Sequence, residues 1–344
     1  MREPSRLSAV SVRSVSLNGR SLMPRWLRIV IAAILLIALA SMMDWSALRE
    51  HASQLDIWIA IVAFTVIGAE MPVNAMKWYW ALRLHDQPFP WRYLFRIGCM
   101  AYFFNNFLPS AIGGDVYRVY RTWSAAGEKT AAVSAVVVER IVGVGVLMMN
   151  GFVGALLLLE HPLARSFVIA CCVAGAIGLV VLPVLVGLAR RGVLSRRFKR
   201  LAGVEAMLGN ILRWRREWIG LLVASAVFQA LAAWVVLLCF AAVGSSIDIP
   251  TALLVTAAAG LASVLPVSIS GLGVVEGSIA GTMVALGGEL ETAVLAALLL
   301  RVLALGVSGL CGLWCFFDDG KSPQLDLAAT PPCTPARTAN RSAA

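Results

Sequence analysis

Long apolar runs separated by short polar segments make up most of this chain. A helix needs about 20 apolar residues to cross a bilayer, and several runs reach or nearly reach that length. They are Trp26–Met43, Ile57–Trp80, Val133–Leu159, Ser166–Leu188, Trp218–Val243 and Ala293–Phe317. The pattern predicts an all-α fold, a polytopic transmembrane helix bundle with six full spans.

The first run allows two interpretations. It follows a basic segment and contains Ala38-Leu39-Ala40, and these features together are typical of a cleavable signal peptide. The segment 1–25 would be a long leader, however, and the run nearly spans a bilayer by itself. We therefore favour an uncleaved first helix.

Three shorter apolar pieces are interrupted by proline and glycine. They are Tyr93–Leu108, Thr251–Leu265 and Val274–Leu286, and each is too short for a full span. Such lengths are typical of half-helices that enter a membrane and return to the side they came from. The sequence therefore predicts two re-entrant or broken-helix hairpins between the full spans.

Lysine and arginine lie almost entirely on one side of this topology. With a cytoplasmic N-terminus and two returning hairpins, the cytoplasmic segments hold 22 of them, and the outer loops hold only Arg49 and Arg165. Because positively charged loops stay in the cytoplasm, we expect both termini there. If Thr251–Leu286 crossed the membrane once and did not return, the C-terminus would lie outside.

Composition excludes water as the main solvent of the folded part. Hydrophobic residues make up 60% of the chain and charged residues only 14%, against roughly half and a quarter in soluble domains. The net charge of +10 does not indicate nucleic acid, because the basic residues lie between the apolar runs. We expect disordered cytoplasmic tails at 1–25 and 318–344 around one membrane domain, 26–317.

The segment 189–217 is the most basic part of the chain. It holds nine lysine and arginine residues among spaced apolar positions, a pattern typical of an amphipathic helix on a membrane surface. Anionic lipids of the inner leaflet would attract each nearby cation by about 1 kcal/mol. A simple orientation signal is the other interpretation, and the two are compatible.

Two similar segments break the apolar pattern. Leu108–Asp115 reads LPSAIGGD and Leu265–Glu276 reads LPVSISGLGVVE. Each contains Leu-Pro, Ser, Ile, paired glycines and a final acid, and the spacing from Asp115 to Arg140 equals that from Glu276 to Arg301. In the expected topology one segment opens to the cytoplasm and the other opens outward. We therefore expect an inverted repeat whose two units are joined by Ser166–Leu188.

Proline and glycine in these segments predict helix breaks. Pro109 and Pro266 lack a backbone donor and end a helix, and the glycines let the chain turn sharply. Irregular backbone cannot face lipid, so it must be buried in protein or line a cavity where its polar groups bind water or a headgroup. A substrate site where the two breaks meet is one interpretation, and tight-packing turns without a ligand are the alternative.

Charged residues inside or beside the spans are a second signal of a site. They are Glu70, Asp115, Arg118, Glu139, Arg140, Glu276 and Arg301. An ionised side chain at the bilayer centre costs about 2.5 to 3.5 kcal/mol, so each needs a partner or water. We expect Glu276 to pair with Arg301. Arg140 has two candidate partners, Asp115 and Glu139, and purely structural ion pairs are the alternative.

The segments NNFLPSAIGGDVYRVYR and LPVSISGLGVVEG and the Glu139-Arg140 pair closely resemble signature segments of the lysylphosphatidylglycerol synthase transmembrane region. The resemblance covers roughly Arg25–Phe317. Members of that family include bifunctional proteins that make an aminoacylated phospholipid and move it across the bacterial cytoplasmic membrane, and stand-alone membrane proteins. It implies the bacterial cytoplasmic (inner) membrane for this chain. A cytosolic aminoacyl-transferring domain has no counterpart here, so we expect no synthase activity.

The resemblance favours a flippase-like transporter of a phospholipid or a lipid-linked headgroup. The alternative is a membrane component of a lipid-modifying enzyme, synthase-like or glycosyltransferase-associated, with a separate transferase as partner. The sequence contains no catalytic motif and no metal-ligand spacing, so we expect no catalytic residue, no metal and no cofactor. The expected substrate-binding residues are Asn105, Asn106, Ser110, Gly113, Gly114, Asp115, Arg118, Glu139, Arg140, Ser268, Gly271, Gly273, Glu276 and Arg301, with helix breaks at Pro109 and Pro266.

Overall fold

The structure is a computed structural model that describes residues 55–87, 89–107, 113–126, 129–190, 216–264 and 271–317. Within these ranges the regular elements are nine helices and no strand, which confirms the all-α prediction. The helices are α3 (Ile57–Arg83), α4 (Trp91–Phe107), α5 (Gly113–Ala126), α6 (Lys129–Leu157), α7 (Pro162–Arg190), α10 (Arg216–Ala242), α11 (Ile249–Val264), α12 (Val274–Ala285) and α13 (Leu290–Phe317). The predicted tails, the run Trp26–Met43 and most of the basic segment 189–217 lie outside the described residues.

Four helices of the described part are long and apolar enough to cross a membrane, namely α3, α6, α10 and α13. They contain 27 to 29 residues, which corresponds to about 40 Å or more at 1.5 Å per residue. The hydrocarbon core of a bilayer is about 30 Å thick. α7 has 29 residues and covers a further predicted span. These lengths are those of a multi-pass membrane protein.

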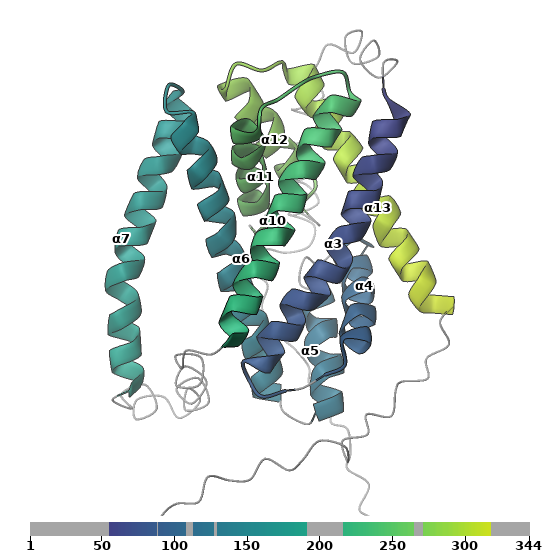
Figure 1. Ribbon diagram of the computed structural model, residues 1–344, viewed down its shortest axis with the longest axis vertical. Coiled ribbons are helices and arrows are strands. Elements are labelled where there is room, and N and C mark those ends of the chain that lie inside the picture. The colour runs from purple at the N-terminus through teal and green to yellow at the C-terminus, as the bar shows by residue number, and fades with distance from the viewer. Residues whose placement is uncertain are drawn as a thin grey trace, which may run out of the picture.

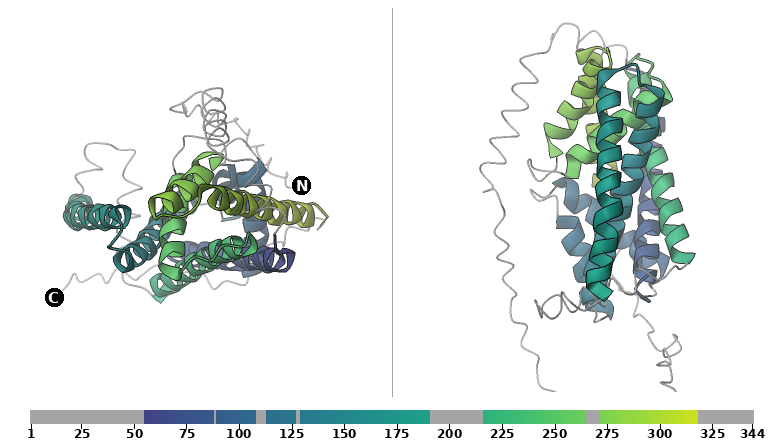
Figure 2. Two further views of the ribbon diagram at one scale, coloured as in Figure 1. Left: turned by 90° about the horizontal axis from the view of Figure 1, so that it is seen from above. Right: turned by 90° about the vertical axis from the view of Figure 1, so that its left-hand side faces the viewer.

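α3 and α10 pack side by side along one face of the bundle (Figures 1 and 2). α3 begins at Asp56, whose carboxylate accepts hydrogen bonds from the Trp58 and Ile59 amides at 2.9 and 3.3 Å. This N-cap satisfies amides that have no partner inside the helix. The Asp56 amide donates to the Ala242 carbonyl at 2.8 Å, which ties the start of α3 to the end of α10.

The short helices form two antiparallel pairs at opposite ends of the bundle. Figure 1 shows α4 and α5 in the lower half and α11 and α12 in the upper half, each pair returning to the end from which it entered. The C-terminal ends of α3 and α7 and the start of α10 lie at the lower end in Figure 1, and in sequence these helices end or begin with an arginine. The prediction that each pair re-enters a membrane, with the lower end cytoplasmic, stays a prediction.

The contacts between helices repeat between two halves of the chain. α4 packs against α5 and α13, and α11 packs correspondingly against α12 and α6. α3 contacts α4 and α6, and α10 contacts α11 and α13. The first unit is therefore α3 to α6 and the second is α10 to α13. α7 joins them and stands at the edge of the bundle beside α6 (Figures 1 and 2).

α5 contributes a buried cation to the bundle. Gly113–Ala126 is helical. The helix is amphipathic: Val116 and Tyr120 are exposed, whereas Arg118 and Thr122 are buried. Arg118 therefore belongs to the interior of the protein.

Glycines allow α6 and α11 to approach closely. A Cβ atom added to Gly154 would lie 2.5 Å from the Pro250 carbonyl oxygen and 3.1 Å from the Leu254 amide nitrogen. Small residues at such contacts are the usual means of bringing two membrane helices together. This contact fixes the second pair of short helices against the first unit.

Gly154→Ala is expected to lower the free energy of unfolding by about 1–3 kcal/mol, because α6 and α11 must move apart. Gly145→Ala is the matched control on the same helix, since a Cβ added there meets no atom within 4 Å. Alanine should stabilise the helix there by about 0.5–1 kcal/mol. Unfolding of detergent-solubilised protein, followed by tryptophan fluorescence, measures both changes. Equal effects would contradict the close contact.

Candidate functional site

The first polar cluster is built around Asp115, the third residue of α5. Its Oδ2 accepts hydrogen bonds from Arg140 Nη2 at 2.6 Å and from Arg140 Nε at 3.1 Å. Its Oδ1 accepts a hydrogen bond from Arg118, one turn further along α5. One carboxylate therefore binds two guanidinium groups, one from its own helix and one from α6.

Glu139 and Lys77 extend this cluster to α3. Arg118 Nη1 donates to Glu139 Oε2 at 2.9 Å, and Lys77 Nζ lies 3.5 Å from Glu139 Oε1. The connected side chains, named the Asp115 network below, are Lys77, Asp115, Arg118, Glu139 and Arg140. The network holds three cations and two carboxylates from three helices.

Aromatic rings cover the inner cations of the network. The Arg118 guanidinium lies 5.0 Å from the ring centroid of Trp78, and the Lys77 ammonium lies 4.5 Å from that of Phe228 on α10. Such contacts contribute about 0.5–2 kcal/mol each. Arg118, Glu139 and Lys77 are buried. Charges removed from water in this way are stable only while their partners remain in place.

The network is open on one side, at Arg140. The Arg140 side chain is 52% exposed, against 5% for that of Arg118 and 4% for that of Glu139. One further donor is unused, because Arg118 Nε is buried and has no hydrogen-bond partner within the described part of the chain. The site therefore presents an accessible guanidinium above a closed, ion-paired interior.

The second polar site pairs Glu276 of α12 with Arg301 of α13. Glu276 Oε1 accepts a hydrogen bond from Arg301 Nε at 2.7 Å, and its Oε2 accepts one from the Gly273 amide at 2.8 Å. A carboxylate in the first turn also interacts favourably with the helix dipole. Gly273 has φ of 77°, a left-handed conformation that glycine adopts without strain.

The two sites occupy corresponding places in the two units. Asp115 and Glu276 are each the third residue of a short helix, and each binds the arginine at the same spacing further along the chain. That arginine also lies at the same position of its long helix in both units. The predicted pairing of Glu276 with Arg301 is confirmed. Of the two predicted partners of Arg140, the structure selects Asp115.

Asn105 and Asn106 hold the neighbourhood of the first break. The Gly114 amide donates to Asn105 Oδ1 at 2.8 Å, and a Cβ on Gly114 would lie 2.6 Å from that oxygen. Asn106 Nδ2 donates to the Tyr102 carbonyl at 3.1 Å and to Ser308 Oγ on α13 at 3.3 Å. Asn105 therefore positions the start of α5, and Asn106 links α4 to α13.

Several predicted residues lie apart from these contacts. Ser110, Ser268, Pro109 and Pro266 lie outside the described residues, so the meeting of the two breaks stays a prediction. Gly113 begins α5, and Gly271 has φ of 73° just before α12. Glu70, the first acid inside a span, makes no hydrogen bond or ion pair to the residues that the structure describes and interacts electrostatically with Lys77.

Sequence reasoning missed Lys77. It lies near the end of an apolar run, where lysine is common and usually reaches toward water. In the structure Lys77 is instead buried against Glu139 and Phe228. Its place two helical turns after Glu70, on the same face of the helix, was the available signal.

Comparison with protein families gives one match. The family model described as the lysylphosphatidylglycerol synthase TM region matches residues 25–312. The chain belongs to this family. Comparison with curated proteins gives no match. Family membership and the apolar helices together identify a multi-pass integral membrane protein with a domain associated with lipid modification or flipping.

Proposed function

We propose that this chain moves a phospholipid, or a lipid-linked headgroup, between the leaflets of the bacterial cytoplasmic membrane. The observation that carries the proposal is the Asp115 network, a group of five charged side chains contributed by spanning helices and a short paired helix. Charged groups at membrane depth are rare and commonly mark substrate or ion pathways. Family membership supports the same assignment.

The charge of the network indicates which headgroups it favours. Its three cations exceed its two carboxylates by one positive charge, and Arg140 carries the exposed guanidinium. A phosphate group supplies a balancing negative charge and accepts paired hydrogen bonds from arginine. In this proposal the phosphate binds at Arg140, and the acyl chains stay in the surrounding lipid.

The repeated architecture supplies a route between leaflets. Two similar units that enter from opposite ends are typical of alternating-access transporters, in which one unit rocks against the other around a central site. The Glu276–Arg301 pair keeps α12 attached to α13. In the proposed mechanism, the first unit holds the headgroup while the second moves as one body.

Arg140→Gln is expected to slow headgroup movement at least tenfold. Loss of one charge-assisted contact of about 1.5–3 kcal/mol corresponds to a factor of roughly 10 to 150. The assay uses purified protein in phosphatidylethanolamine–phosphatidylglycerol vesicles that contain headgroup-labelled phospholipids, with a quencher that reaches only the outer leaflet. Arg165→Gln, which removes an exposed arginine at the opposite end of the bundle, is the matched control and should leave the rate unchanged.

A lipid-modifying role is the second candidate, because the family takes its name from a synthase. A deletion strain distinguishes the two candidates. Loss of a modified lipid, with normal movement of the same lipid when supplied ready-made, would favour the enzyme component. Wild-type protein that accelerates leaflet exchange of no native lipid would overturn the transport proposal.

A further inference from the structure

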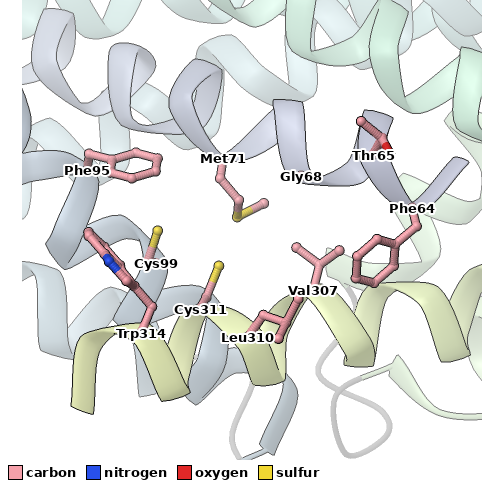
Figure 3. A pocket seen from close by; sticks show the side chains of 10 residues that line it. All are labelled: Phe64, Thr65, Gly68, Met71, Phe95, Cys99, Val307, Leu310, Cys311 and Trp314. Carbon is pink, nitrogen blue, oxygen red and sulfur yellow. The ribbon is translucent and has the colours of Figure 1, made fainter. Parts of the chain in front are cut away.

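An apolar groove of about 430 Å³ opens between α3, α4 and α13. Its size falls within the range of roughly 300–1,000 Å³ usual for small-molecule sites. Figure 3 shows Met71 and Gly68 on one wall, Cys311 and Trp314 on the opposite wall, and Cys99 close to Cys311 and Trp314. The three helices are far apart in sequence, so the groove exists only in the folded chain.

The lining offers water few polar groups. Its one hydroxyl, that of Thr65, already donates to the Ile61 carbonyl at 2.9 Å. The other lining side chains are aliphatic, aromatic or sulfur-containing, and the Trp314 indole N–H is the one further strong donor among them. A mainly apolar lining of this kind holds water poorly, so the favourable occupant is another apolar group.

The groove is continuous with the apolar outer surface of the bundle. Leu310 and Trp314 line it and are also exposed, and Leu313 and Phe316 extend the same exposed face of α13. In a membrane protein this surface contacts acyl chains. A lipid chain can therefore enter the groove from the side without crossing a polar barrier.

Two glycines of other helices are closely packed, unlike the one in this groove. α11 packs on α6, and a Cβ added to Gly260 would lie 2.6 Å from Leu147. A Cβ added to Gly151 would lie 2.8 Å from the ring of Phe167, which belongs to α7. At Gly68 an added Cβ meets no atom within 4 Å. The groove lies where the first unit, through α3 and α4, meets α13 of the second.

We propose that this groove is a binding site for one acyl chain of a bilayer phospholipid. The chain lies between α3 and α13 and contacts Met71, Cys99 and Cys311. The site recognises the apolar part of the lipid, and it would bind whether or not the Asp115 network moves a headgroup. Its occupancy is therefore measured without any transport assay.

The test uses a phosphatidylcholine that carries a photoactivatable diazirine in one acyl chain. Purified protein is reconstituted in vesicles of phosphatidylethanolamine and phosphatidylglycerol with this probe, irradiated and digested, and the labelled residues are found by mass spectrometry. Met71, Cys99 and Cys311 should be labelled several-fold more often than Val173 and Ile177, which are exposed on α7. Enrichment no greater than at α7 would overturn the proposal.

Gly68→Trp provides the matched test of location. The indole would fill the groove, so labelling of its walls should fall several-fold while labelling of α7 stays constant. Gly145→Trp, at an exposed glycine with no atom near an added Cβ, should change neither. Unchanged wall labelling in a folded Gly68→Trp variant would count against the site. If that variant does not fold, the labelling of the groove residues relative to the α7 residues in the wild-type protein still decides whether the groove binds an acyl chain.

A third measurement identifies a different occupant. Gly68→Cys is treated with short bifunctional thiol cross-linkers after cysteines are introduced singly within the apolar run 26–43. Efficient cross-linking within one chain, together with absence of lipid label at Met71, would mean that this run fills the groove, and the acyl-chain proposal would be wrong. Absence of cross-linking with strong lipid labelling is the expected result.

Discussion

Glu139→Gln is expected to lower the free energy of unfolding by about 3–5 kcal/mol. The Glu139 carboxylate is the shared partner of Arg118 Nη1 and Lys77 Nζ, and both cations are buried. A neutral amide leaves two cations with too little negative charge in a region of low dielectric constant. The loss is large because the uncompensated charge cannot reach water.

The prediction is measured on purified protein in dodecylmaltoside micelles, unfolded by added sodium dodecyl sulfate and followed by tryptophan fluorescence. Glu160→Gln, an exposed acid in the turn between α6 and α7, is the control and should change stability by less than about 0.5 kcal/mol. The double variant Lys77→Met with Glu139→Gln should recover part of the loss, since it removes one unpaired cation. A loss below about 1 kcal/mol for Glu139→Gln would show that the cations find other partners, in contrast to the usual cost of an unpaired buried charge.

Neighbouring residues in this network are expected to behave differently. Glu139 and Arg140 are adjacent in sequence, but successive residues point about 100° apart around a helix. Glu139 therefore faces the interior, and Arg140 faces the open side. Substitution of Glu139 should act mainly on stability, whereas substitution of Arg140 should act mainly on headgroup movement.

Pairing between acids and arginines could be predicted from sequence because the same pattern of acid and arginine occurs in both units of the repeat. The same spacing between acid and arginine occurs in both units, and each acid follows a glycine-rich break. The repeated pattern predicted the pairing of Glu276 with Arg301 and left Asp115 and Glu139 as candidate partners of Arg140, of which the structure selects Asp115. The apolar runs likewise predicted the described spanning helices, because membrane helices are specified by length and hydrophobicity.

The parts that could not be predicted depend on burial and on contacts distant in sequence. The sequence marked Arg118 as a charge beside a span, but it did not show that α5 turns this side chain inward onto Trp78. Lys77 looked like an ordinary residue at the end of a span. The groove brings together α3, α4 and α13, which are distant in sequence. No local sequence pattern indicates that a Cβ added to Gly68 would meet no atom within 4 Å. The groove in particular follows from packing between distant helices and leaves no periodic signal along the chain.

Arg301→Met is expected to destabilise the second unit by about 3–5 kcal/mol. Glu276 is 2% exposed, and without Arg301 Nε its charge would rest mainly on the Gly273 amide. Loss of the Glu276–Arg301 pair should also weaken the attachment of α12 to α13. Arg165→Met, which removes an exposed arginine that donates to the Leu159 carbonyl, should change stability by less than about 0.5 kcal/mol.

The double variant Glu276→Gln with Arg301→Met separates lost charge balance from lost packing. Replacing a buried ion pair by neutral groups of similar volume is often close to neutral, and glutamine can still accept the Gly273 hydrogen bond. The double variant should therefore be more stable than Arg301→Met alone by at least about 2 kcal/mol. The same detergent titration measures all three proteins. If the double variant is as unstable as the single one, the arginine acts through the packing of its side chain, and the buried carboxylate is not what makes its removal costly.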